Sequence, residues 1–238
     1  MDSVSMTLKC VVCGESHPLM SSFLGVCPVC ARKPESREAA AEAHRRSLET
    51  FGLKTPSGSG VRCGQCVNGC SMDEGDRGLC GVRMNSSDKV VSAFGDQAAV
   101  EWYYDPLPTN CVAEWVCGAK AAYQPVQSKS LAVFFHGCTF DCLFCQNWHH
   151  KERLLSHAPL RSLERLVKAV DSDTHCACFF GGDPTPQLQF ALRACDEWMS
   201  IPEGMPRICW ETNGSMSPAL ADRIAEVSIR TGAPSSSI

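Results

Sequence analysis

The chain has 238 residues, a formal net charge of −4 and an isoelectric point near 6.0. This length suits one ordinary domain plus a smaller module, and the slight excess of acidic residues argues against a global basic surface for nucleic acid. No apolar run reaches the ~20 residues that a membrane helix needs, and the start is not typical of a secretion signal. The chain contains 17 cysteines. We therefore expect a cytoplasmic protein whose cysteines bind metal rather than form disulfides.

Two cysteine pairs lie near the start of the sequence, Cys10-x-x-Cys13 and Cys27-x-x-Cys30. Four thiolates can close a tetrahedral zinc site that leaves no position for a substrate. A rubredoxin-like iron site and four unmetallated thiols are the alternatives, because thiolates bind both metals. We interpret residues 1–33 as a zinc-ribbon-like module whose metal supplies its folding free energy.

The next segment, residues 34–60, is predicted to be a helix followed by a flexible linker. Pro34 near the start, glutamates in the first turn and Gly52 as a C-cap favour a helix over Pro34–Phe51. The Ser- and Gly-rich stretch 54–60 then reads as a linker. We therefore expect a domain boundary there.

A second set of cysteines follows the linker within residues 61–130. Several glycines between these cysteines predict a loop that wraps closely around a small group. Four thiolates would satisfy zinc or a second iron–sulfur cluster, and spacing alone does not choose between them. The four candidate ligands are Cys63, Cys66, Cys70 and Cys80.

Residues 85–125 have the pattern of short strands and turns. We expect a turn over residues 85–88, a strand over 89–94 and another over 100–104, ended by the prolines that follow. Cys111 and Cys117 are read as packed free thiols, with extra metal ligands as the alternative. The aromatic residues of this segment are expected in the core.

From residue 131 the pattern alternates strands with helices. Such alternation predicts an α/β fold with a parallel sheet, here with three βα units. In parallel sheets ligands gather at the carboxyl ends of the strands, and the loops at 136–147, 181–184 and 211–214 all fall at such ends. The expected strands are 131–135, 175–180 and 207–210, and the expected helices are 162–170, 186–199 and 218–227.

The loop after the first of these strands carries three cysteines at i, i+4 and i+7, namely Cys138, Cys142 and Cys145. Three thiolates can hold three corners of an iron–sulfur cube whose usual complement is four. One iron would then be left open for chemistry. The same spacing could mark one apolar helix face, but Thr139 and Asp141 interrupt that stripe.

This Cys138-x-x-x-Cys142-x-Phe144-Cys145 run resembles the signature of the radical S-adenosylmethionine (SAM) enzymes. Gly137 and the Gln-Asn pair after Cys145 resemble the branch of pyruvate formate-lyase activating enzymes, and the segment around Cys63 also resembles a region of some of these relatives. The resemblance implies a partial radical SAM barrel over residues 131–238, with a [4Fe-4S] cluster held by the three cysteines. It also implies SAM as cofactor, cleaved reductively to a 5′-deoxyadenosyl radical.

The resemblance extends to residues beside SAM. Gly181, Gly182 and Asp183 resemble the Gly-Gly-Glu loop that binds the SAM amino group through its backbone, with aspartate in place of glutamate. Glu211-Thr212-Asn213-Gly214 resembles a strand end beside SAM, and Phe144 would sit near the adenine. Taken alone, both segments could be an ordinary turn or cap. His149 and His150 are expected to be exposed loop histidines rather than proton relays. The SAM-binding residues implied are Gly181, Gly182, Asp183, Phe144, Thr212 and Asn213.

The resemblance covers residues 61–228, whereas the family's barrel continues through further βα units. We therefore expect the C-terminal half of the barrel to be missing. The sequence ends in a low-complexity tail, so truncation is the favoured interpretation, and a second polypeptide that completes the barrel is the alternative.

Three functional hypotheses follow from this pattern. The first is a radical SAM enzyme that takes electrons from a ferredoxin or flavodoxin and abstracts hydrogen from an unknown substrate, with a glycyl-radical protein as a candidate. The second is a truncated, non-catalytic iron–sulfur and zinc protein for electron transfer or assembly. The third, a zinc-ribbon adaptor that binds nucleic acid or a partner, is disfavoured by the charge balance and by the absence of a face with interleaved aromatic and basic residues. No general acid or base is identified from the sequence.

Overall fold

A computed structural model describes residues 8–54, 56, 58–109, 111–117, 128–156, 158–201 and 205–232 of the chain. The residues fall into two units, one formed by 1–54 with 141–143 and one by 55–140 with 144–238. The low-complexity tail at 233–238 and two linker positions, 55 and 57, lie outside the described residues. Among the helices described, none combines the length and apolar character needed to cross a membrane.

The first unit contains the N-terminal cysteines and one long helix. The helix predicted over 34–51 is present as a short 3₁₀ turn, η2 (Pro34–Ser36), followed by α1 (Arg37–Thr50). It ends where predicted, because Gly52 adopts a φ of +64° that residues with a Cβ rarely adopt. Another 3₁₀ turn, η1 (Cys30–Arg32), precedes it.

Two small hairpins begin the second unit. The first pairs β1 (Val61–Arg62) with β2 (Ser71–Met72), and the second pairs β3 (Arg83–Ser86) with β4 (Lys89–Ser92). The turn predicted over 85–88 is shorter than expected, because Asn85 and Ser86 belong to β3. Only Ser87 and Asp88 form the turn, with φ of +54° and +59°, the geometry of a tight two-residue hairpin.

The main sheet has five strands in the order β7-β5-β6-β8-β9. The predicted strands at 131–135, 175–180 and 207–210 are confirmed as β6, β8 and β9, which run parallel to one another. The sheet is mixed rather than wholly parallel, since β5 pairs antiparallel with both β6 and β7. The strand bounds are β5 (Ala98–Pro106), β6 (Lys129–Phe135), β7 (Leu160–Arg161), β8 (Thr174–Gly181) and β9 (Arg207–Trp210).

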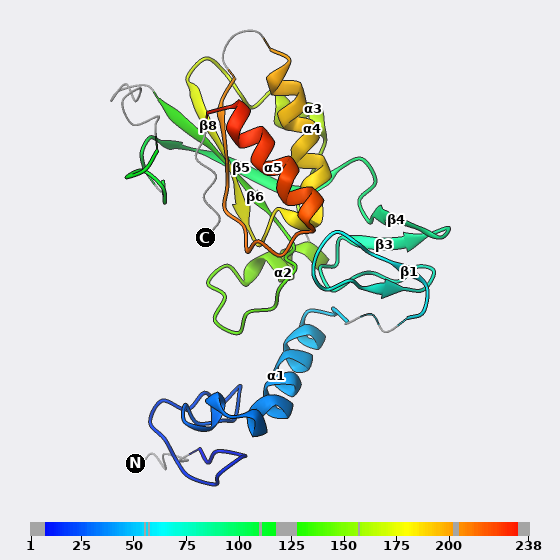
Figure 1. Ribbon diagram of the computed structural model, residues 1–238, viewed down its shortest axis with the longest axis vertical. Helices are drawn as coiled ribbons and strands as arrows, with labels where there is room; N and C mark the ends of the chain where they lie inside the picture. Colours follow the sequence, from blue (N-terminus) through cyan, green and yellow to red (C-terminus); the bar gives the residue numbers. More distant parts are fainter. Residues whose placement is uncertain are drawn as a thin grey trace. The chain divides into compact units, whose positions relative to one another are not determined.

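Helices cover one face of this sheet (Figure 1). The three predicted helices are present with shifted ends, because α3 stops earlier than expected and α5 continues three residues further. The remaining helix, α2, was not predicted. The helical bounds are α2 (His149–Ser156), α3 (Leu163–Val167), η4 (Thr185–Gln187), α4 (Leu188–Met199) and α5 (Pro218–Arg230).

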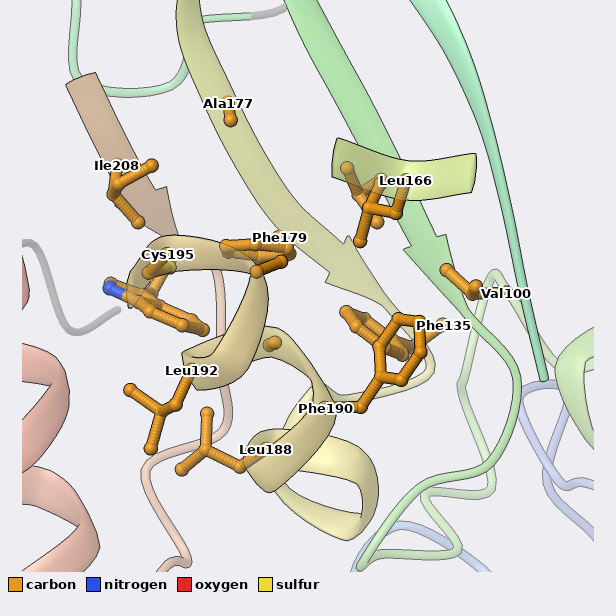
Figure 2. Packing of buried hydrophobic residues seen from close by; sticks show 14 of the residues in the cluster. Val100, Phe135, Leu166, Ala177, Phe179, Leu188, Phe190, Leu192, Cys195 and Ile208 are labelled. Atoms are coloured by element: carbon orange, nitrogen blue, oxygen red, sulfur yellow. The ribbon is translucent and has the colours of Figure 1, made fainter. Parts of the chain in front are cut away.

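The core lies between this sheet face and the helices. Strand residues alternate in direction, so Phe135, Phe179 and Ile208 point toward α4. Figure 2 shows Phe179 and Ile208 near Cys195, and Phe135 near Phe190, of that helix. Phe179 and Trp198 are fully buried, and truncation of such a side chain to alanine costs about 3–5 kcal/mol. The packed face therefore fixes the strands whose ends carry the candidate site.

The expectation that the aromatic residues of 85–125 lie in the core holds for only part of the described segment. Trp102 packs against the core cluster. Tyr103, Tyr104 and Trp115 are 45%, 44% and 82% exposed. Tyr103 lies on the sheet face that the helices leave uncovered, whereas Tyr104, on the other face, donates from its hydroxyl to Ala169 O at 2.6 Å. Hydrophobic patterning alone therefore overestimates their burial.

Candidate functional site

The loops after β6, β8 and β9 emerge at the same edge of the sheet, because these strands are parallel neighbours. They begin at His136, Gly182 and Glu211 respectively. The candidate ligands of cluster and SAM predicted from the sequence lie on these loops.

The Gly181–Gly182 pair packs its backbone directly on the start of the cysteine loop. Gly182 N donates to Phe135 O at 2.9 Å, and Asp183 N donates to Gly137 O at 3.0 Å. A Cβ at Gly182 would lie 2.2 Å from Gly137 O, which no side chain tolerates. Gly181 also has a φ of +114°. Glycine is therefore required here by close backbone approach and dihedral angle together.

Asp183 is the buried centre of this loop system, with 1% of its surface exposed. One carboxylate oxygen, Oδ1, accepts hydrogen bonds from Thr212 Oγ1 at 2.6 Å and from Asn213 N at 3.1 Å. The other, Oδ2, accepts from Thr185 N at 3.0 Å. The Asp183 carboxylate therefore orders the loop after β9, although its side chain is shorter than the glutamate of the Gly-Gly-Glu loop that it resembles.

Asn213 extends this network to the cysteine loop. Its Nδ2 donates to Thr139 Oγ1 at 2.8 Å and lies 3.7 Å from Cys138 Sγ. The Thr139 hydroxyl also lies 2.6 Å from that of Ser215, and both residues are buried. The loops after β6, β8 and β9 are consequently linked through one chain of polar contacts.

Cys138 sits among positive and hydrogen-bond-donating groups. Phe140 N donates to its sulfur at 3.3 Å, in addition to the Asn213 amide. The Lys151 side chain is 4% exposed; burial lowers its pKa, and the Cys138 thiolate acts in the opposite direction. Such surroundings favour the thiolate form that binds metal.

The other residues of the cysteine loop are less enclosed. Cys138, Cys142 and Cys145 are half-buried, and Phe144, predicted beside adenine, is 86% exposed. The sulfurs of these three cysteines are not among those that lie within 4.8 Å of one another. The roles of these four residues stay predictions.

Comparison with known proteins identifies this region. Residues 132–232 match the family model described as "Radical SAM superfamily". The chain contains a radical SAM domain. That domain encloses the cysteine loop, the Gly-Gly-Asp loop and the Thr-Asn loop, so an iron–sulfur cluster and SAM are the cofactors it implies.

Two relatives from Methanocaldococcus jannaschii share part of this sequence. The chain is 35% identical to the uncharacterized protein MJ0808 over 112 residues, which cover 46% of this chain and 31% of the relative. It is 28% identical to the uncharacterized protein MJ0674 over 93 residues, or 35% of this chain and 26% of the relative. The chain thus spans less than a third of the length of either relative, and no solved structure matches it.

A compact cysteine cluster lies outside the radical SAM domain, near the N-terminus. The ligand atoms of Cys10, Cys13, Cys27 and Cys30 all lie within 4.8 Å of one another, and this is the one such group among the described residues. Cys27 N donates to Cys10 Sγ at 3.3 Å and Cys30 N donates to Cys27 Sγ at 3.4 Å. These backbone N–H groups would stabilise metal-bound thiolates, so the four residues fit a metal ion.

Protonation within this cluster is uneven. The hydrogen bond from Cys27 N lowers the pKa of the Cys10 thiol to about 6. Burial, followed by hydrogen bonding to the neighbouring cysteines, raises the pKa of the Cys30 thiol to about 12. A metal ion would displace the protons that remain.

The second predicted cysteine set forms a looser group. Cys63 N donates to Cys70 O at 2.7 Å beside the β1–β2 hairpin. Burial, together with the nearby thiolates of Cys63 and Cys70, raises the pKa of the Cys80 thiol to about 11. Burial and the same two thiolates also raise the pKa of Cys66. The four residues therefore interact electrostatically, although their sulfurs are not among those that converge within 4.8 Å.

The interpretation of the two histidines after the cysteine loop as exposed loop residues is wrong in part, because both lie on α2. His149 is exposed, but His150 is only 1% exposed, on the unpredicted helix α2. Its ring packs where a side chain at Gly182 would stand, with Cγ 2.8 Å from the ideal Cβ position. Burial lowers its pKa to about 4, and nearby His136 contributes in the same direction. His150 thus supports the glycine loop as a neutral group.

Several supporting residues were not identified from the sequence, chiefly Thr139, Ser215 and Lys151. No spacing pattern in a sequence marks a threonine or a serine as a residue that joins two loops. The Lys151 burial depends on α2, whose eight residues are too short for a clear apolar period. Their position becomes apparent only once the three loops are assembled.

Proposed function

We propose that this chain is a radical SAM enzyme in which Cys138, Cys142 and Cys145 hold a [4Fe-4S] cluster. The observation that carries the proposal is the position of this cysteine motif inside the matched domain, on the loop after β6 and bonded to the loops after β8 and β9. When bound, the cluster supplies an electron that cleaves SAM reductively, and the resulting 5′-deoxyadenosyl radical abstracts hydrogen from the substrate.

The residues of the chain have positioning roles in this proposal. Gly181 and Gly182 expose backbone without side chains, which suits close approach of the SAM amino group. Asp183 holds Thr212 and the Asn213 backbone in place, and the Asn213 amide adds a donor beside Cys138. The buried Lys151 adds positive charge near the same sulfur, which would offset part of the negative charge of a thiolate-bound cluster.

The remaining parts of the proposal concern metals and partners. The N-terminal cluster would hold structural zinc, and Cys63, Cys66, Cys70 and Cys80 would hold zinc or a second cluster. We further propose a cytoplasmic protein that receives electrons from a ferredoxin or flavodoxin. A glycyl-radical protein is the proposed substrate class, suggested by the resemblance of the Gly137 and Gln146-Asn147 flanks to activating enzymes.

Anaerobic cluster reconstitution followed by chemical reduction with SAM tests the proposal. We expect 5′-deoxyadenosine to form with the wild-type chain and to be lost in Cys142→Ala. Cys195→Ala is the matched control, because Cys195 is a buried thiol of α4 outside the cysteine loop. A change in the electron paramagnetic resonance spectrum of the reduced cluster on addition of SAM would report binding separately from cleavage.

The same experiment also tests the alternative function, that of a non-catalytic protein. A cluster that assembles and is reduced, but leaves SAM intact and its spectrum unchanged, would favour a non-catalytic iron–sulfur protein for electron transfer or assembly. Failure of Cys142→Ala to lower the cluster content would show that the cluster is held elsewhere.

A further inference from the structure

The second cysteine set carries a short segment, residues 65–68, that pairs with the chain just after the Thr-Asn loop. Val67 N donates to Ser215 O at 2.9 Å, and Ser217 N donates to Gln65 O at 2.8 Å. These two bonds enclose an antiparallel bridge between the two backbones. The segment is therefore attached to the radical SAM domain by backbone bonds that do not depend on a bound metal.

Asn68, at the end of this segment, reaches the cysteine loop with its side chain. Its Nδ2 donates to Thr139 O at 2.5 Å. Thr139 directly follows Cys138 and is 2% exposed, whereas Asn68 itself lies on the surface. The contact is consequently a polar one, made outside the hydrophobic core, and a change at Asn68 leaves the core packing intact.

The peptide group that Asn68 holds is the one that donates to the Cys138 sulfur. The carbonyl of Thr139 and the N–H of Phe140 belong to one planar trans peptide, so they point in opposite directions. Asn68 binds the carbonyl on one side, and Phe140 N donates to Cys138 Sγ at 3.3 Å on the other. Rotation of this peptide would break both bonds. Asn68 therefore fixes the direction of a donor that is aimed at a predicted cluster ligand.

A second donor to the same sulfur is attached to the same pair of segments. Asn213 Nδ2 lies 3.7 Å from Cys138 Sγ, and Asn213 Oδ1 accepts from Ser215 N at 3.0 Å. Ser215 is also the residue whose carbonyl accepts from Val67 N. The surroundings of the Cys138 sulfur thus depend on a segment that lies about 70 positions earlier in the sequence.

We propose that Asn68 is a positioning residue that orients the Thr139–Phe140 peptide toward Cys138 and thereby sets the reduction potential of a cluster bound there. The inference rests on the proposed function, because it requires Cys138 as a cluster ligand. Hydrogen bonds to the sulfurs are among the features that set the potential of an iron–sulfur cluster. An N–H donor stabilises the reduced, more negative form more than the oxidised form, so loss of this bond should lower the potential.

Hydrogen–deuterium exchange tests the positioning role before any cluster is bound. Exchange of the Phe140 amide is followed in the full chain before reconstitution, with overlapping peptides that resolve this position. Asn68→Leu keeps a side chain of similar size, adds no charge and has no hydrogen to donate. We expect it to speed this exchange about 2- to 10-fold, the factor that corresponds to one net hydrogen bond. Val67→Ala is the matched control, because it trims a neighbouring side chain that is 71% exposed and keeps the backbone N–H.

The reduction potential separates this role from a general effect on stability. After reconstitution, a redox titration followed by electron paramagnetic resonance measures the potential of the cluster. We expect a more negative potential in Asn68→Leu and the wild-type value in Val67→Ala. Asn68→Gln, which keeps an amide donor, should restore part of the wild-type potential. Asn68→Ala should shift the potential in the same direction as Asn68→Leu and keeps the test valid if Asn68→Leu does not fold.

The outcomes distinguish this inference from the proposed function. With a cluster that Cys142→Ala removes, an unchanged potential in Asn68→Leu would overturn the inference alone, whether or not the exchange at Phe140 is faster. Unchanged exchange at Phe140 would overturn it too, because the peptide would then be held without Asn68. Cluster content that is unaffected by Cys142→Ala would overturn the proposed function and this inference together.

Discussion

Thr212 donates a 2.6 Å hydrogen bond from its hydroxyl to the buried carboxylate of Asp183, joining the loop after β9 to the loop after β8. Oδ1 of the same carboxylate also accepts from Asn213 N. An N–H and an O–H therefore converge on one anionic oxygen in a site that water hardly reaches. Hydrogen bonds to a buried charged group are among the stronger ones in proteins.

Asp183→Asn should destabilise the chain by about 1–3 kcal/mol, because the amide replaces a charged acceptor that serves three donors. We expect urea denaturation to show a lower midpoint with an unchanged slope. Asp222→Asn, on the exposed surface of α5, is the matched control and should have little effect. Equal midpoints for the two variants would contradict a structural role of the Asp183 carboxylate.

The parallel strands and the loops at their ends were accessible to sequence reasoning for a physical reason. Buried strands such as Leu131–Phe135 are continuously apolar, and the glycines that follow mark a sharp change of direction. Local composition therefore predicts both β6 and the start of the cysteine loop. The role of β5 could not be read in this way, since its antiparallel pairing with β6 depends on contacts distant in sequence.

Side-chain burial around the loops was less predictable than the backbone. His150 and Lys151 are polar residues that follow a loop, a pattern typical of exposed positions, yet both are buried beneath the site. The alternation of Cys176 and Cys178 was visible in the sequence, but its meaning depends on which sheet face the helices leave uncovered. Such assignments require the tertiary arrangement.

Gly182→Ala should disrupt the link between the glycine loop and the cysteine loop. The added methyl group would meet Gly137 O at 2.2 Å and the His150 ring at 2.8 Å, so backbone must move, at a cost of about 1–3 kcal/mol or more. We expect a lower thermal midpoint together with a lower cluster content after reconstitution. Gly64→Ala is the control, because a Cβ there meets no atom within 4 Å; a Gly182→Ala chain as stable as this control would show that the close packing is not maintained.

His150 should make the chain less stable in mild acid. Its folded-state pKa of about 4 lies below the ordinary value of 6.5, so the unfolded chain binds more protons between these pH values. The free energy of unfolding should therefore fall as pH drops from 6.5 toward 4, by up to ~1.4 kcal/mol per pH unit from this residue. The buried His136, whose pKa is also lowered by burial, acts in the same direction.

Urea denaturation at pH 7.5, 6.5 and 5.5 measures this dependence. His150→Gln should reduce the loss of stability between pH 6.5 and 5.5, whereas His149→Gln, an exposed neighbour on α2, should leave it unchanged. An identical pH dependence in both variants would mean that His150 is not held neutral in the folded chain.

Removal of the N-terminal metal should unfold that module while sparing the radical SAM domain. Cys10, Cys13, Cys27 and Cys30 bring four sulfurs within 4.8 Å around very little apolar core, so bound metal would supply much of the module's stability. Metal analysis of the full chain should find zinc that is lost when Cys10 and Cys13 are both replaced by serine. Proteolysis should then cut within residues 8–33 first. Unchanged zinc content in the double variant would show that these thiols do not hold it, and iron in its place would assign a rubredoxin-like site.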